Sequence, residues 1–268
     1  MRGCVRRSRA ILAAVLIAAA ALPVLAAPQR VVSMNLCSDQ LAMMLAAPGQ
    51  LISVSDLAQD PRMSPMAEQA AAYAANTGRA EEIYLMRPDL VIAGTYTPGA
   101  TVAMLRRLGI PVEIRPPAED SDAIRAEITR MGDLLERPDA ARDLLTRFDA
   151  DLAAARSSDT HGRAALYYAN GFTSGEDTLA GSILGAAGYR NIAADYGITA
   201  TTTLPMELLV MARPDRLITG AKWPGHSQGE AILDHPALDA ITDAPPRTTD
   251  RNWICGTPFV TRAIWSLR

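Results

Sequence analysis

Short apolar runs alternate with helical patterns in the first half of the chain. Strands are predicted at residues 30–34, 51–55 and 110–114, and helices are predicted from Ser38 and over residues 101–108. Ser38 is a suitable helix cap, because Leu41, Met44 and Leu45 follow it on one helical face. Strands that alternate with helices predict a mainly parallel sheet. We therefore expect an α/β lobe here.

Two segments 126 residues apart carry nearly the same pattern. Residues 81–94 read EEIYLMRPDLVIAG and residues 207–220 read ELLVMARPDRLITG, so Glu, Arg, Pro, Asp, Ile and Gly recur in register. Each copy predicts a short helix, a stop before Arg-Pro-Asp and a buried strand that ends at Gly. A repeat of this length is too long for a solenoid and fits two duplicated lobes. Function is then expected in the cleft between the lobes.

A long helical pattern separates the two copies. Its apolar stripe consists of Ile124, Ile128, Met131, Leu135, Leu144, Leu145, Phe148 and Leu152. The stripe is interrupted at Arg137-Pro138, and Pro138 suits the first turn of a new helix. A connection between the lobes is the preferred interpretation. A coiled-coil partner is the alternative, although the apolar face is not a sustained heptad.

The remaining patterns complete a second lobe. They predict a strand over residues 164–169, a helix over 178–187, a short helix at 235–238, a last strand ending at 253–256 and a helix from about Pro258. The expected divisions are a leader at 1–26, a first lobe at 27–119, a connecting helix at 120–160 and a second lobe at 161–268.

The first residues have the three parts of a secretory signal peptide. Basic residues precede the apolar run of residues 10–25, and small residues follow it, which favours cleavage after Ala26. A membrane anchor is the alternative, but Pro23 breaks the run, which is only marginally long enough to span a bilayer. We therefore expect an exported, soluble chain; the Sec and Tat routes both stay open.

Charge and cysteine content narrow the classes of partner. Cleavage removes four arginines and no acid, so the formal net charge moves from −3 to −7, which makes nucleic acid an unexpected partner. The three histidines lack metal-ligand spacing, so no metal site is expected. Cys37 and Cys255 remain after cleavage. They leave three interpretations open: a disulfide, a contact with a ligand metal, or two reduced thiols.

Several motifs in this order resemble one family. They are RVVSMNLCSDQLAMML, the two Glu-x6-Pro-Asp units, LGIPVEI, ILGAAGYRNIA, HPALDAI and an aromatic-rich segment near the end of the chain. Together they resemble the periplasmic substrate-binding proteins of ABC importers for cobalamin, ferric siderophores and haem. The resemblance implies two Rossmann-like lobes joined by a long helix, a ligand held between the lobes, little hinge motion and a monomer.

The resemblance also implies a pair of docking residues. In the family, one acidic residue on each lobe contacts arginines of the membrane permease. Glu81 and Glu207 match, because each stands seven residues before its proline, Pro88 or Pro214. The alternative is that each glutamate only complements a helix dipole. Two such residues in register favour docking.

Loops after strand ends are expected to line the cleft, as in open α/β sheets. The predicted ligand-binding residues are Asn35, Cys37, Tyr96, Tyr168, Phe172, Trp223, Trp253 and Arg262. Aromatic residues at such loops suit a large planar or macrocyclic ligand. Ordinary loop packing is the alternative for each aromatic residue, and an ordinary surface position is the alternative for Arg262.

The preferred function is a non-enzymatic receptor for a metal chelate that contains cobalt or iron, with no cofactor of its own. Cobalamin is slightly preferred over a ferric siderophore, because binding an anionic chelate usually requires more basic residues than the predicted cleft contains. Haem would need an axial ligand such as Tyr96, Tyr168 or His226. Two alternatives remain: a haem or metal storage protein without a permease, and an exported thiol enzyme with Cys37 as nucleophile and His226 as base.

Overall fold

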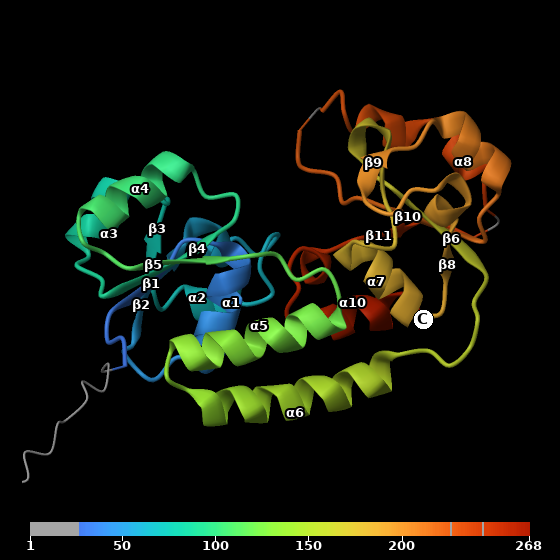
Figure 1. The fold of residues 1–268 in the computed structure, drawn as a ribbon. Helices are drawn as coiled ribbons and strands as arrows, with labels where there is room; N and C mark the ends of the chain where they lie inside the picture. The colour runs from blue at the N-terminus through green and yellow to red at the C-terminus, as the bar shows by residue number, and fades with distance from the viewer. Residues whose placement is uncertain (1–26, 226, 243) are drawn as a thin grey trace, which may run out of the picture.

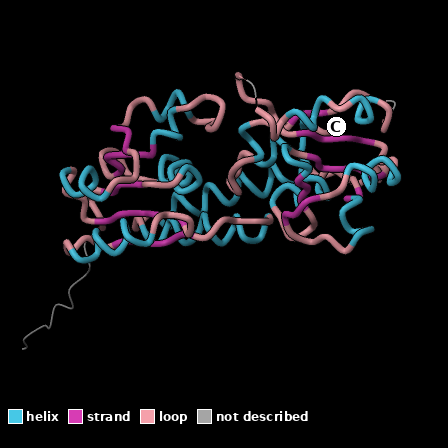
Figure 2. Tube along the Cα trace, turned by 90° about the horizontal axis from the view of Figure 1, so that it is seen from above, coloured by secondary structure: helices cyan, strands magenta, loops and turns pink. Residues whose placement is uncertain are grey.

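The computed structural model describes residues 27–225, 227–242 and 244–268 (Figure 1). The predicted signal peptide, residues 1–26, and His226 lie outside the described residues. Within those ranges, no helix is both long and apolar enough to cross a membrane. The strands and helices form two lobes that lie side by side, as the view from above also shows (Figure 2).

The first lobe contains a parallel sheet with the order β3-β2-β1-β4-β5. Its strands are β1 (Val31–Ser33), β2 (Leu51–Ser55), β3 (Ala74–Asn76), β4 (Leu90–Gly94) and β5 (Val112–Arg115). Its helices are α1 (Leu36–Leu45), α2 (Ala67–Ala70), α3 (Ala80–Leu85) and α4 (Gly99–Arg107). Ile83 of α3 and Leu105 of α4 pack on one face of the sheet, and Leu41 of α1 packs on the other. The predicted parallel α/β lobe is confirmed.

The second lobe contains a parallel sheet with the order β11-β10-β6-β8. Its strands are β6 (Arg163–Tyr167), β8 (Arg190–Asn191), β10 (Arg216–Thr219) and β11 (Arg247–Thr248), and β7 (Phe172–Ser174) pairs with β9 (Thr201–Thr203) in a separate antiparallel sheet. Its helices are α7 (Leu179–Ala186), α8 (Met206–Ala212), α9 (Pro236–Asp239) and α10 (Val260–Ser266). Ile183 of α7 and Ile264 of α10 pack on one face, and Leu209 of α8 packs on the other.

The predicted duplicated unit is confirmed as α3 followed by β4 and α8 followed by β10. Each helix is followed by an arginine in the left-handed region, Arg87 with φ 50° and Arg213 with φ 45°. Each strand lies in the interior of its sheet, where it pairs with two neighbours. The same sequence pattern therefore produces the same local structure in both lobes.

Helices α5 (Ser121–Leu134) and α6 (Pro138–Ala155) connect the lobes. The expected interruption is confirmed: the chain turns at Glu136, with φ 53°, and Pro138 opens α6. The two helices run side by side below both lobes, and α6 alone leads into the second lobe (Figure 1). One hydrophobic cluster includes Leu41 of α1, Phe148 of α6 and Leu166 of β6, so the two lobes share a continuous core. The numerical limits given above for the lobes stay a prediction.

Two predicted details are wrong. The cap of α1 is Asn35 and not Ser38, because the Asn35 Oδ1 accepts hydrogen bonds from the backbone N–H groups of Cys37 at 3.1 Å and Ser38 at 3.3 Å. Residues 253–256 do not end a strand. The last strand is β11, and the chain then forms a 3₁₀ helix, Arg251–Trp253, whose first turn is capped by Asp250.

Candidate functional site

Two hollows lined by residues of both lobes meet at Ile254, which is 41% exposed. The first has a volume of about 190 Å³, and its lining includes Asn35, Cys37, Gly94, Tyr96, Arg115 and Gly256. The second has a volume of about 290 Å³, and its lining includes Arg62, Met63, Lys222, Trp223 and Asp250. We call the two together the interlobe groove. It lies beyond the C-terminal ends of β1, β4, β5 and β10, where ligand sites of open α/β sheets are found.

The wall of the groove in the first lobe depends on a close approach between two strand ends. Asn35 follows β1 and caps α1, and Gly94 ends β4. A Cβ atom at Gly94 would lie 2.6 Å from the Asn35 Nδ2 and 3.0 Å from its Cγ, so a side chain at this position would displace the amide that caps α1. Tyr96 follows two residues later and is 85% exposed. The structure therefore brings Asn35 and Tyr96 together in one hollow.

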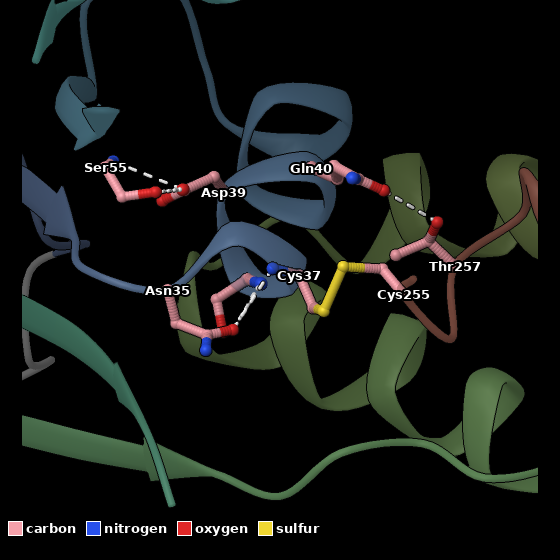
Figure 3. Close-up of a disulfide and its surroundings, with 8 residues drawn as sticks. Asn35, Cys37, Asp39, Gln40, Ser55, Cys255 and Thr257 are labelled. Carbon is pink, nitrogen blue, oxygen red and sulfur yellow. Dashed lines mark hydrogen bonds between the residues drawn. A yellow bond between two sulfur atoms is a disulfide. The ribbon is translucent and has the colours of Figure 1, made fainter. Parts of the chain in front are cut away.

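A disulfide joins Cys37, which lines the first hollow of the groove, to the buried Cys255 (Figure 3). It joins the first turn of α1 to the segment after the last 3₁₀ helix, across 218 residues of sequence. Beside it, the Thr257 hydroxyl donates a 2.8 Å hydrogen bond to the Gln40 Oε1. Of the three interpretations left open for the cysteines, the disulfide is confirmed. The reduced thiols and the metal contact through both sulfurs are wrong.

A loop of the first lobe reaches across the groove to the second lobe. The Arg62 guanidinium lies 4.5 Å from the ring centroid of Trp223, and the Arg251 Nη1 donates a 2.8 Å hydrogen bond to the Pro61 carbonyl. Trp223 is 47% exposed. A cation over an indole face is attracted by its quadrupole, so this contact fixes one edge of the groove. The prediction from sequence named Trp223 but missed Arg62.

The cations that line the groove are paired with carboxylates. Arg115 forms a 2.6 Å ion pair with Glu127, and both side chains are largely buried. Arg62 pairs with Asp60 at 2.6 Å, and Lys222 pairs with Asp234. Much of the positive charge at the groove is therefore already neutralised by the protein. Among the described residues, no group of three or more His, Cys, Asp or Glu is arranged to hold a metal ion.

Four predicted ligand-binding residues do not line either hollow: Tyr168, Phe172, Trp253 and Arg262. Trp253 is only 8% exposed and belongs to the shared core, because the 3₁₀ helix turns it inward. Tyr168 is partly buried against the same core, and burial raises the pKa of its phenol to about 12. Phe172 lies on the short antiparallel sheet, and Arg262 stacks on the Phe259 ring at 4.7 Å.

The side of α1 that faces away from the disulfide carries a buried acid. Asp39 is fully buried and points toward Ser55, whose backbone N–H donates a 3.2 Å hydrogen bond to the Asp39 Oδ2 and whose hydroxyl bonds to the same oxygen (Figure 3). Burial raises the pKa of Asp39 to about 7, against the opposing effect of its serine hydrogen bonds. The helix that positions Cys37 is thus anchored through a carboxyl group that prefers to stay protonated.

This carboxyl makes stability depend on pH. In the unfolded chain Asp39 ionises near its ordinary pKa of 3.8, whereas the folded state retains the proton up to about pH 7. The free energy of unfolding therefore falls as the pH rises from about 4 to about 7. The total fall is roughly 4 kcal/mol, because each unit of difference between the folded and unfolded pKa corresponds to about 1.4 kcal/mol. Asp39→Asn should lack this fall. Urea unfolding at pH 5 and pH 8 measures it, with the exposed Asp143→Asn as control. An equal pH dependence in Asp39→Asn and wild type would contradict the assignment.

The two predicted docking residues occupy equivalent places in the two lobes. Glu81 lies in the first turn of α3 and Glu207 in the first turn of α8, and both are exposed. Neither carboxylate takes part in an ion pair or hydrogen bond within the described ranges. Glu82, by contrast, accepts 2.9 Å hydrogen bonds from the backbone and hydroxyl of Thr77. Glu82 thus holds a turn in place, and Glu81 remains available to a partner.

Comparison with known proteins agrees with this architecture. Residues 31–244 match the model of a family described as periplasmic binding protein. The chain belongs to this family. The match covers most of both lobes and the connecting helices. The periplasmic binding protein family consists of binding proteins and not of enzymes.

The relatives of this periplasmic binding protein are named for different ligands. A cobalamin-binding protein of Halobacterium salinarum is 30% identical over 203 residues, 72% of this chain, which spans only 54% of that relative's length. A haem-binding protein, RhuT of Roseiflexus sp. RS-1, solved without ligand, has a TM-score of 0.70 at 24% identity over 89% of this chain and 96% of that chain. The vitamin B12-binding protein BtuF of Vibrio cholerae has a TM-score of 0.65 at 19% identity, over 90% and 96%. The two structural likenesses show the shared two-lobed fold.

The disulfide bears on the thiol-enzyme alternative. That alternative needs Cys37 as a free thiolate nucleophile, but its sulfur is bonded to Cys255. The proposed base, His226, lies outside the described residues. With the sulfur of Cys37 held in a disulfide, the alternative lacks its nucleophile.

Proposed function

We propose that this chain is a periplasmic receptor that binds a metal chelate in the interlobe groove and delivers it to an ABC importer. The observation that carries the proposal is the exposed aromatic residue in each hollow, Tyr96 in the first and Trp223 in the second. A groove with aromatic surface suits a broad macrocyclic ligand, because aromatic side chains contact much area at little entropic cost. Membership of the periplasmic binding protein family supports the same function.

Among metal chelates, cobalamin is preferred. Arg62, Arg115 and Lys222 each have a carboxylate partner, so the groove offers little unpaired positive charge to an anionic siderophore. An axial phenolate for haem iron must be deprotonated, and the raised pKa of Tyr168 disfavours that residue in this role. The name of the Halobacterium salinarum relative points the same way.

Fluorescence titration of the mature protein tests this function. Cobalamin should quench tryptophan emission saturably at sub-micromolar concentration, because Trp223 lies in the second hollow and is exposed. Haemin and a panel of ferric siderophores are titrated in parallel. Trp223→Phe should lose most of the quenching, whereas Trp265→Phe, on the exposed side of α10, should retain it.

The competing outcomes each have a definite meaning. Saturation by haemin alone would replace cobalamin by haem as the ligand and leave the receptor function standing. Absence of saturable quenching by every chelate, checked by calorimetry with the same ligands, would overturn the metal-chelate proposal.

A further inference from the structure

The two docking helices share a pattern of exposed apolar residues. In α3, Tyr84 and Leu85 follow Glu81 at positions i+3 and i+4; in α8, Val210 and Met211 follow Glu207 at the same positions. Residues at this spacing lie on one helical face. Each lobe therefore presents a glutamate and two large apolar side chains as one stripe. We call these the α3 stripe and the α8 stripe.

The apolar members of the stripes are unusually exposed. Leu85 is 78% exposed and Met211 is 75% exposed, more than any other large aliphatic side chain in the described part of the chain. Tyr84 and Val210 are 49% and 39% exposed. Single exposed apolar residues are common on protein surfaces, but a pair repeated in register on two lobes points to a contact surface.

A hollow lies at the C-terminal end of each stripe. The one beside α3 has a volume of about 490 Å³ and is lined by Leu85, Arg87 and Pro88 among others. The one beyond α8 has a volume of about 430 Å³ and is bordered by the equivalent Arg213 and Pro214. The left-handed conformation of each arginine ends the helix at this point and turns the chain into its strand. The two lobes thus repeat charge, apolar stripe and hollow in the same order.

We propose that the α3 and α8 stripes extend the two glutamates into one docking surface for a partner that presents the same basic and apolar surface twice. This rests on the proposed function, in which the partner is the pair of membrane subunits of the importer. Both helices lie on the side of the lobes away from α5 and α6 (Figure 1), so a partner that spans both lobes on that side is in a position to contact both. A repeated surface on one chain fits a partner made of two equivalent subunits.

A second copy of this chain is a poorer occupant of the same surface. A twofold contact through these helices would bring Glu81 and Glu207 of two molecules close together, and like charges in an interface repel. A partner with arginine or lysine beside an apolar surface satisfies both parts of each stripe. The apolar pairs then supply buried area, while the glutamates set register and orientation.

The test compares uptake with ligand affinity for three variants. Cells that carry Leu85→Ser/Met211→Ser in place of the wild-type chain should take up radiolabelled cobalamin at least about tenfold more slowly, with ligand affinity of the purified protein unchanged. Leu85→Ser and Met211→Ser alone should each give a part of this loss. Trp265→Ser, a 49% exposed apolar residue on α10, is the matched control and should have normal uptake.

Several outcomes would overturn the inference. Normal uptake by the double variant, together with loss of uptake when Glu81 and Glu207 are reversed, would show that the apolar residues of the stripes take no part in docking. The receptor function would stand. A loss from only one of the two single variants would contradict a partner with two equivalent surfaces. A wild-type dimer in solution that dissociates in the double variant would assign the stripes to self-association. Failure of the wild-type protein to bind any chelate would instead count against the proposed function itself.

Discussion

Reversal of both predicted docking glutamates, Glu81→Arg/Glu207→Arg, is expected to abolish transport without weakening ligand binding. Each carboxylate is exposed in the first turn of its helix, lacks an ion-pair partner within the described ranges and lies outside the lining of the interlobe groove. Replacing an attractive charge by a repulsive one at both ends of an interface should lower uptake by about a hundredfold or more, since each tenfold corresponds to about 1.4 kcal/mol. Uptake by whole cells and fluorescence titration of the purified variant measure the two quantities separately.

The matched control for this variant is Glu68→Arg. Glu68 is also exposed and also lies in the first turn of a helix, α2. If Glu81 and Glu207 only complement helix dipoles, all three positions should lose a few tenths of a kcal/mol of stability and leave uptake unchanged. Normal uptake by the double reversal would favour a storage protein without a permease. Loss of uptake in Glu68→Arg as well would point to a general effect of charge.

The duplicated unit could be predicted from sequence because several independent signals coincide there. Arg-Pro stops each helix, an apolar run follows, and glycine ends the strand, in both copies. The fold class follows, since alternating helices and strands imply parallel sheets. The short strands β3 and β9 were missed, because Ala74–Asn76 and Thr201–Thr203 have little apolar pattern and become strands only by pairing with neighbours.

The site was harder to predict because tertiary contacts decide which loops reach the groove. Asn35, Tyr96 and Trp223 follow strand ends, so the rule for parallel sheets found them. Arg62 comes from a loop inside a long polar segment, and nothing local indicates that it crosses to Trp223.

Trp253 is the opposite case, a residue that the sequence placed in the site and that does not line the groove. Its aromatic character suggested a strand end at the cleft, but local capping by Asp250 formed a turn that buries the indole. An accurate prediction required knowing which of two local preferences, strand or capped turn, the surrounding packing would select.

Removal of the disulfide should cause the largest loss of stability of any change considered. The bond closes a loop of 218 residues, and a closed loop of that length lowers the entropy of the unfolded chain by an amount worth about 5 kcal/mol in the chain-entropy model. For a chain of this size, about 2–4 °C of Tm is lost per kcal/mol, so Cys37→Ser/Cys255→Ser should melt roughly 10–20 °C below the wild type. Differential scanning calorimetry of the mature protein measures the change.

Comparison of the single variants, the double variant and the reduced wild type separates the effect of the disulfide bond on Tm from the effect of replacing the cysteine side chains. Cys37→Ser and Cys255→Ser should each lower Tm nearly as much as the double variant, because either removes the same bond. Wild-type protein treated with dithiothreitol should melt with them, while the double variant should be insensitive to dithiothreitol. Equal Tm values for oxidised wild type, reduced wild type and double variant would show that the bond contributes nothing.

The bond should also matter to the ligand, because it ties Cys37 in the wall of the first hollow to the segment that carries Ile254. Ile254 lies next to Cys255 and borders both hollows, and the Gln40–Thr257 hydrogen bond also links α1 to this segment. Without the disulfide, binding must first order the segment, and that ordering lowers affinity. At a temperature where both proteins are fully folded, cobalamin affinity should therefore fall by about tenfold in the double variant. If affinity stays constant while Tm falls, the disulfide acts on the unfolded chain alone. The Gln40–Thr257 hydrogen bond and the surrounding core then suffice to hold the segment around Ile254 in place.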